Sequence, residues 1–366
     1  MFRWLAQMLR RGPEPSPRRR PVPRLPRQAE EAPAGEATLP DGMDPAFAPF
    51  AGVLGVAPGA APPLVPEDQD EDLRVAALVL EHFQRNRPGP ASAPSLSLQI
   101  LNLVANPRTG AADLARLVQN DPALAASMLQ VANSAYYRGV QEVESVREAV
   151  ARIGVEEAGR VGGALAAKSL FSARMRQEFA AFSARYDHLF RRSVAVAAVS
   201  ASLAMKTPGA RSDRAYLGGM LLDVGKSVGL RSLSALLVDG KVALAPEDPR
   251  VDRVLERVHL EIGGEVHQEW NLPQYLTVLC VRHHDDAIPG DAEFRDLHVV
   301  RLVSALEDLR RDPAAAPHAA AEVVQSAAAL RVDPLAARAL SAELRTAEER
   351  VARTFTVEGR APPAAR

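Results

Sequence analysis

An acidic residue follows an apolar stretch near the middle of the chain. Residues 217–222 are uncharged and mostly apolar, Asp223 comes next, and Gly225 and Lys226 follow it. An ionised carboxyl group at the end of a buried helix is unfavourable unless a partner satisfies it, because it loses its contact with water. Asp223 is therefore either a structural carboxylate with a neighbouring partner or a member of a functional site.

Two other groups of side chains have types that could take part in catalysis. Glu261, Glu265 and Glu269 recur at every fourth position, and such a carboxylate stripe could support acid–base chemistry. A solvated helix face explains the same spacing better. Cys280 lies in an apolar stretch and is expected to be a small buried side chain rather than a reactive thiol. A single cysteine leaves no internal disulfide and fits a reducing compartment, so we expect a cytoplasmic protein.

Several short motifs follow one another along the chain. They are NDPAL at residues 120–124, ANSAYY at 132–137, LGGMLLDVGK at 217–226, HLEIG at 259–263, WNLP at 270–273 and RHH at 282–284. Together they resemble the HDOD domain of bacterial signalling proteins, over roughly residues 90–345. The stretch around Asp223 resembles the Leu-Leu-His-Asp-Ile-Gly-Lys core of the HD phosphohydrolase superfamily. The resemblance implies an all-α, HD-like fold and a signalling module that binds a protein partner or a small ligand without being an enzyme.

The resemblance also assigns residues to a metal site. Metal-dependent HD phosphohydrolases bind their first ion through a histidine on a long helix, the His-Asp doublet and a late aspartate, since an ion that activates water takes oxygen and neutral nitrogen ligands. In this chain Arg192, Leu222 and Ser304 stand at three of those positions, and the doublet keeps Asp223. Arg192 carries a permanent positive charge where the ion would lie. The resemblance therefore implies a degenerate metal site and argues against the ordinary hydrolase reaction.

A second set of residues is retained. Asp223, His259, His283 and His284 resemble the ligands of a second ion in binuclear cyclic-di-nucleotide phosphodiesterases of the superfamily, and Lys226 stands where those enzymes contact phosphate. The adjacent histidines would point about 100° apart on a helix, so both can bind one ion only where the backbone departs from the helix.

Two alternatives remain open for these retained residues. In the first, they form a polar cluster or ligand pocket that needs no cofactor, and Asp223 pairs with the histidines or with Arg192. In the second, a residual divalent ion supports a metal-dependent phosphohydrolase or phosphodiesterase. The sequence favours the first, because most ligands of the first ion are missing.

Asn133, Ser134, Tyr136 and Tyr137 could form an interaction surface in the first part of the domain. Alternatively, Asn133 and Ser134 satisfy backbone groups while the tyrosines pack between subdomains. The expected partner is a signalling protein. The remaining histidines show no ligand spacing and are expected to be surface or structural residues: His82, His188, His267, His298 and His318.

The elements that must position these residues are helices. Aromatic residues make up only 5% of the chain, which favours helix packing over sheets. Helical periodicity begins at residue 71 and continues, interrupted by proline and glycine, to about residue 354. The sequence therefore predicts an all-α domain over residues 69–345 with a first lobe at about 90–171 and an HD-like lobe at about 172–311, followed by the end of the last helix and a tail at 346–366.

Residues 1–68 differ in composition from the rest of the chain. The first 90 residues hold 16 of the 29 prolines, and residues 1–28 carry eight arginines against one acidic residue. Proline at this density removes backbone donors and prevents long helices, which predicts a disordered Pro/Arg-rich tail and linker. Its arginines could attract nucleic acid or a membrane surface, but a solubilising tail explains them better. No stretch reaches the roughly 20 apolar residues of a membrane-spanning helix.

Overall fold

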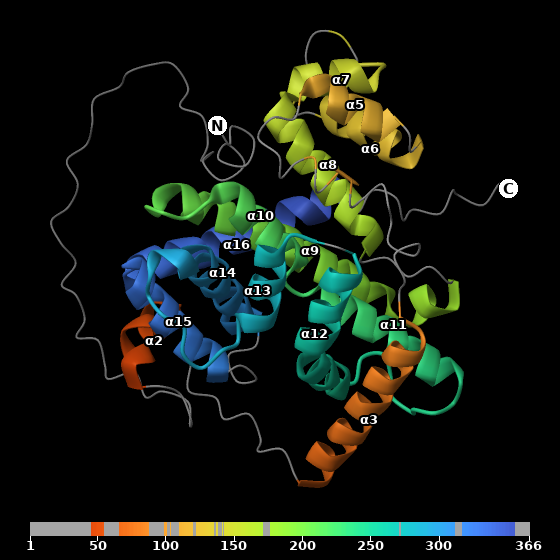
Figure 1. The fold of residues 1–366 in the computed structure, drawn as a ribbon, viewed down its shortest axis with the longest axis vertical. Helices are drawn as coiled ribbons and strands as arrows, with labels where there is room; N and C mark the ends of the chain where they lie inside the picture. The colour runs from red at the N-terminus through yellow and green to blue at the C-terminus, as the bar shows by residue number, and fades with distance from the viewer. Residues whose placement is uncertain are drawn as a thin grey trace, which may run out of the picture.

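The computed structural model describes residues 45–54, 66–87, 99–100, 103, 110–119, 122–134, 137, 141, 143–170, 176–270, 272–311 and 317–355. Every regular element in these ranges is a helix, which confirms the all-α prediction (Figure 1). None of these helices combines the length and the hydropathy that a membrane-spanning segment needs.

The helices in the described part of the chain differ widely in length, from the 3 residues of η1 to the 31 residues of α9. From the N-terminal to the C-terminal side they are η1 (Pro45–Phe47), α2 (Ala48–Leu54), α3 (Pro66–Arg85), α5 (Ala111–Gln119), α6 (Pro122–Asn133), α7 (Val146–Ile153), α8 (Val155–Leu170), α9 (Arg176–Lys206), α10 (Ser212–Leu221), α11 (Val224–Val238), α12 (Pro249–Glu269), α13 (Gln274–Arg282), η3 (Ala292–Phe294), α14 (Arg295–Arg311), α15 (Pro317–Leu330) and α16 (Pro334–Phe355).

Helices α5 to α8 form a first lobe with its own hydrophobic core, at the top of Figure 1. Ser145 caps α7 by accepting a hydrogen bond from the backbone N–H of Glu148 at 3.2 Å. Helix α7 ends at Ile153, and the next residue, Gly154, has a φ of 90° that favours glycine. Tyr216 of α10 donates a hydrogen bond from its hydroxyl to the carbonyl oxygen of Arg160 on α8 at 3.1 Å, and this bond connects the first lobe to the rest of the chain.

The long helix α9 lies at the centre of the remaining helices and packs against α10, α14 and α16, while α11 packs against α12 and α3. Two glycines allow close approach of backbones in this region. A Cβ atom on Gly219 would lie 2.8 Å from the backbone of Ala197 on α9, and one on Gly225 would lie 2.0 Å from the carbonyl oxygen of His259 on α12. The turn that carries Asp223 is therefore held between α9 and α12.

The structure corrects the extent of the predicted N-terminal tail. Within residues 1–68 it places η1 against α15 and α2 against α16. Phe47 and Phe50 are buried there and stack at a ring centroid distance of 6.0 Å. The prediction from composition was wrong for this segment because Pro45 and Pro49 lie in first turns, where a missing N–H leaves no hydrogen bond unmade. The tail prediction for residues 1–44 and 55–65 lies outside the described residues.

Candidate functional site

Asp223 lies in the short turn between α10 and α11. The apolar stretch of the sequence forms the end of α10, and the Asp223 carboxylate that follows is 1% exposed. Lys226, in the first turn of α11, places its Nζ 3.3 Å from Oδ1 of Asp223. Leu222 belongs to the hydrophobic core that α9 shares with α14, α15 and α16. Its role in this chain is therefore packing.

Arg192 of α9 lies directly against Asp223. Its Nη1 donates to Oδ2 of Asp223, and its Nη2 donates to Oγ of Ser304 at 2.8 Å. The same Nη2 donates to both carboxylate oxygens of Asp308, at 2.8 and 3.0 Å. Because Arg192 is only 4% exposed, one buried cation joins α9, the Asp223 turn and α14. The structure thus brings together Arg192, Asp223 and Ser304, which the sequence had placed in one degenerate ligand set.

The surrounding charges keep Asp223 ionised. Burial alone would raise the pKa of the Asp223 carboxyl, but the charges of Arg192 and Lys226 outweigh burial and lower the pKa below its usual range. Burial also opposes the charge of Lys226, whereas Asp223 and Glu256 raise its pKa above the usual value. Lys226 pairs with Glu256 of α12 at 2.6 Å. Removing one partner from a fully buried ion pair such as Arg192–Asp223 costs about 3–5 kcal/mol, because the other charge is left uncompensated.

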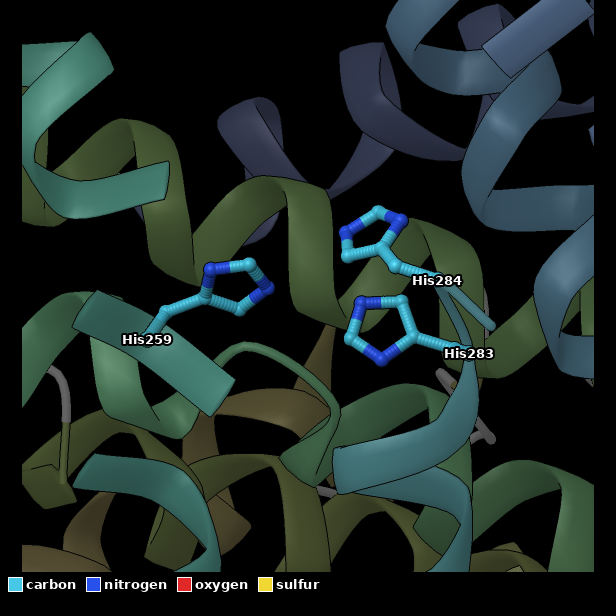
Figure 2. Close-up of side chains that lie close together, drawn as sticks. All are labelled: His259, His283 and His284. Carbon is cyan, nitrogen blue, oxygen red and sulfur yellow. The ribbon is translucent and has the colours of Figure 1, made fainter. Parts of the chain in front are cut away.

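The imidazoles of His259 and His283 lie close together (Figure 2), and Nε2 of His259 is 3.9 Å from Oδ1 of Asp223. His259 Nδ1 donates to the carbonyl oxygen of Glu256 at 2.8 Å, and His283 Nδ1 donates to that of Cys280 at 2.7 Å. Burial lowers the pKa of His259 to about 4 and lowers the pKa of His283 well below its usual value. Each Nε2 therefore carries a lone pair, and neither has a hydrogen-bond partner in the described part of the chain.

His284 differs from these two rings because it lies between two carboxylates. Its Nδ1 is 2.6 Å from Oε1 of Glu322 on α15, and its Nε2 is 3.2 Å from Oε1 of Glu256. Burial would lower the pKa of His284, but hydrogen bonds with Glu256 and Glu322 raise it to about 9. Helix α13 ends at Arg282, so His283 and His284 lie in a turn, and their ring centroids come within 4.0 Å of each other. The divergence expected on a helix does not occur.

The histidines meet the ligand requirements of a metal ion, whereas the position of Arg192 does not. One ring nitrogen from each of His259, His283 and His284 lies within 4.8 Å of the others. Three imidazoles suit a borderline ion such as Zn²⁺. On the other side, the Arg192 guanidinium already bonds Asp223, and a permanent cation there repels an ion. The cluster thus offers metal ligands on the side of the three histidines and a fixed cation on the side of Arg192.

A family model for the HDOD domain matches residues 91–286, more than half of the chain. This chain belongs to the HDOD family. The match includes Arg192, Asp223 and the three clustered histidines, whereas Ser304 and Asp308 lie beyond its end.

Solved structures share the fold of this HDOD protein but little of its sequence. An HDOD domain protein of unknown function from Geobacter sulfurreducens is 19% identical with a TM-score of 0.52, over 77% of this chain and 98% of that chain. A protein from Shewanella amazonensis SB2B, provisionally named a metal-dependent phosphohydrolase, is 17% identical with a TM-score of 0.52, over 76% and 99%. A protein from Marinobacter aquaeolei VT8, provisionally named a signal transduction protein, is 19% identical with a TM-score of 0.51, over 72% and 59%.

Among curated proteins, an uncharacterized protein of Treponema pallidum (strain Nichols) is 26% identical over 213 residues. The match covers 56% of this chain and 39% of the relative. The chain therefore corresponds to less than half of the length of that protein.

Three acidic residues of the cluster in this HDOD domain were not predicted from the sequence. Glu256 precedes His259 by three residues on α12, and Asp308 follows Ser304 by four on α14. Residues at these spacings share a helix face, so this signal was present in the sequence. Glu322 comes from α15, and the packing of separate helices brings it to His284. No local pattern predicts that contact.

The candidate interaction surface lies in the first lobe of the HDOD domain. The Asn133 side chain donates to the carbonyl oxygen of Val143 and accepts from the N–H of the same residue, both at 2.8 Å, and Arg152 donates to it at 3.3 Å. These bonds close the loop between α6 and α7 and favour the structural alternative for Asn133. Ser134 and Tyr137 are partly buried, and Tyr136 lies outside the described residues.

Among the described residues, no hydrogen bond joins a histidine without ligand spacing to His259, His283 or His284. His298 is buried and its ring lies within hydrogen-bond distance of Ser326 Oγ at 3.3 Å and of the Pro289 carbonyl oxygen at 3.0 Å. His267 is 1% exposed on α12. Both are therefore structural rather than surface residues, and the side chain of His318 lies outside the described residues.

The glutamate stripe and the cysteine have structural roles as well. Glu265 and Glu269 form ion pairs with Arg87 at 2.8 and 3.8 Å, and Glu261 is exposed. This arrangement fits a solvated helix face that also contacts the end of α3. Cys280 is fully buried, and burial raises the pKa of its thiol to about 12, so the thiolate that reactive cysteines need does not form at neutral pH.

Proposed function

We propose that this HDOD domain is a non-catalytic regulatory module of bacterial signal transduction, which binds a protein partner or a small ligand and passes on a regulatory state. The observation that carries the proposal is the Arg192 guanidinium bonded to Asp223 and Ser304. A hydrolase of the HD type needs an ion at this position to activate water. Arg192 supplies a positive charge there but no ligand position that water can occupy, and a guanidinium does not lose its proton in a protein.

Family membership supports this proposal in part, since one structural relative carries a signal-transduction name and another a phosphohydrolase name. The fold is compatible with both functions. The residues at the ligand positions distinguish them, because Arg192 and Leu222 replace imidazoles and Ser304 replaces a carboxylate in the set that the hydrolases use. A chain with these replacements keeps the scaffold and loses the centre that activates water.

The alternative is a metal-dependent phosphohydrolase or phosphodiesterase that works from the three histidines. Two buried imidazole lone pairs favour this alternative. Lys226, which would contact phosphate, argues against it. Its ammonium group pairs with Asp223 at 3.3 Å and with Glu256 at 2.6 Å, so these carboxylates already compensate its charge.

The test is hydrolysis by the purified full chain. The substrates are bis(p-nitrophenyl) phosphate and a cyclic dinucleotide, with Mg²⁺, Mn²⁺ or Zn²⁺ supplied in turn. We expect no turnover above that of the free ion. Metal-dependent turnover that His259→Ala removes and His188→Gln retains would overturn the proposal. His188 is a suitable control because it is a partly buried histidine of α9 outside the three-histidine group.

A further inference from the structure

We infer that His259, His283 and His284 form a binding site for a single zinc-type ion that does not use Asp223 as a ligand. The inference goes beyond the proposed function and rests on it in one respect, namely that the ion has a structural or regulatory role and not a catalytic one. Its starting point is the convergence of three imidazoles from α12 and from the turn after α13 (Figure 2), with ring nitrogens within 4.8 Å of one another.

Two of the three ligands are already oriented for an ion. The bonds from Nδ1 of His259 to the Glu256 carbonyl and from Nδ1 of His283 to the Cys280 carbonyl fix the tautomers and leave each Nε2 as an acceptor. Both histidines are 1% exposed, so bulk water does not satisfy these nitrogens. A buried acceptor without a donor is unfavourable, and a bound ion would remove that disadvantage.

His284 supplies the third ligand when an ion replaces the proton on its Nε2. That nitrogen lies 3.2 Å from Glu256, while Nδ1 lies 2.6 Å from Glu322. With Nε2 on the ion, Nδ1–H keeps its bond to Glu322, which gives the carboxylate–histidine pair that orients many metal-bound imidazoles. The displaced proton passes to solvent, and Glu256 becomes available as an oxygen ligand.

The charge of the cluster favours a divalent cation. Four carboxylates belong to its bonded network: Asp223, Glu256, Asp308 and Glu322. Within the described residues, the permanent cations bonded to this network are Arg192 and Lys226. Two negative charges therefore remain when the imidazoles are neutral, which matches the charge of one divalent ion. Such an excess attracts a cation strongly in a partly buried site, where water screens charges less.

Two permanent cations already pair with the carboxylate of Asp223. Arg192 bonds its Oδ2 and Lys226 lies 3.3 Å from its Oδ1, so an ion at the histidines would have to displace Lys226 to gain this carboxylate as a ligand. The inferred site is therefore mononuclear and rich in nitrogen, unlike the binuclear sites that the retained residues resemble. Nitrogen-rich sites prefer Zn²⁺, Co²⁺ or Ni²⁺ to Mg²⁺, Mn²⁺ or Ca²⁺. Ion selectivity thus separates the inferred site from a residual hydrolase site.

The test uses the full chain without a histidine tag, treated with a chelator and titrated calorimetrically with zinc sulfate and with magnesium chloride. We expect one Zn²⁺ per chain, bound at least about 100-fold more tightly than Mg²⁺. Cobalt in place of zinc should give the visible absorption bands of a four-coordinate, nitrogen-rich site. His283→Gln should abolish binding and His188→Gln should retain it. Should circular dichroism show that His283→Gln is unfolded, His284→Gln replaces it, since this side chain is 16% exposed.

Asp223→Asn separates the inferred site from the binuclear type. We expect this variant, once shown to be folded, to bind Zn²⁺ within about tenfold of wild type, since Asp223 is not a ligand. Loss of binding in the folded variant would overturn the inference, as would a wild type that binds no Zn²⁺. Absence of both zinc binding and hydrolysis would leave the proposed regulatory function standing. Zinc binding accompanied by phosphodiester cleavage would keep the inferred site and refute the proposed function.

Discussion

The arginine side of the cluster (Arg192, Asp223, Ser304 and Asp308) and the histidine side (His259, His283 and His284) satisfy their polar groups in opposite ways. On the arginine side a permanent cation bonds Oδ2 of Asp223 and the side chains of Ser304 and Asp308 on α14. On the histidine side two buried nitrogens keep lone pairs without a donor in the described chain. The contrast teaches that one buried polar cluster can combine a side whose charges are compensated by an internal cation with a side whose acceptors lack a donor.

Arg192→Leu should break the arginine side and have the largest effect. The change leaves Asp223 buried without its main partner, so we expect the free energy of unfolding to fall by about 3–5 kcal/mol, measured by urea denaturation. Arg191→Leu is the matched control. Arg191 pairs with Asp187 at 2.8 Å near the surface, and such pairs contribute less than about 1 kcal/mol. Equally small losses in both variants would show that Arg192 is not a structural cation.

Lowering the pH should change the contributions of the two sides to folding stability differently in the metal-free protein. The folded-state pKa of His259 lies at about 4, below the usual 6.5, chiefly because of burial. Protonation therefore favours the unfolded chain, and stability is lost as the pH falls from about 6.5 to about 4, by roughly 3 kcal/mol for this residue. Asp223 adds little to this loss, because its lowered folded-state pKa and the unfolded-state value of about 3.9 both lie below the window.

Urea denaturation of chelator-treated wild type and His259→Gln across this pH range measures the effect. The variant lacks the titrating imidazole, so its stability should fall less steeply than that of wild type. The same pH dependence in both proteins would contradict the neutral state assigned to His259.

The combined change Arg192→His, Leu222→His and Ser304→Asp should convert the arginine side into a set of metal ligands. It replaces a fixed positive charge and an apolar side chain with two imidazoles and adds a second carboxylate beside Asp223. With Mn²⁺ at about 100 times its Kd, the bound ion should stabilise the folded variant by about 2.7 kcal/mol, seen as a rise in Tm. Wild type should show no such rise.

Asp223→Asn added to the triple variant is the control, because it removes the retained carboxylate and should abolish the dependence on Mn²⁺. Manganese is the chosen ion since the nitrogen-rich histidine side binds it weakly. A triple variant that is folded by circular dichroism yet insensitive to Mn²⁺ would mean that the four positions do not converge on one point.

Glu256→Gln tests the contact between the two sides and should have the smallest effect. Glu256 pairs with Lys226 and with His284, but its side chain is 38% exposed. We expect the free energy of unfolding to fall by less than about 1 kcal/mol, while the pKa of His284 falls because Glu256 is among the groups that raise it. Titration of the His284 ring by NMR measures the shift. An unchanged pKa would show that Glu322 alone holds the proton.

The sequence predicted the features for which local pattern and motif order agree. The apolar stretch before Asp223 indicated a buried acid that needs a partner, and the resemblance placed Arg192 and Ser304 in the same set. Glu256 and Asp308 were missed because both lie outside the motifs that carry the family resemblance. Each lies three or four residues from a site residue that was already identified, and this helical spacing indicated both.

Other features depend on packing between distant segments, which no local pattern records. The pair of His284 and Glu322 forms because α15 packs beside the turn after α13, with 38 residues between the two side chains in sequence. The burial of Phe47 likewise depends on α15, which follows it by most of the chain. Composition correctly described a proline-rich segment but could not show that part of it has a hydrophobic surface to bind.

Gly225 shows how the close packing of two helices can fix one residue of a sequence signature. A Cβ atom at this position would lie 2.0 Å from the carbonyl oxygen of His259, so α11 can begin beside α12 only with glycine there. This requirement is steric and does not depend on any ion, so it holds whichever residue stands at position 222. A match to Asp-x-Gly-Lys therefore reports backbone geometry at this turn and not a reaction.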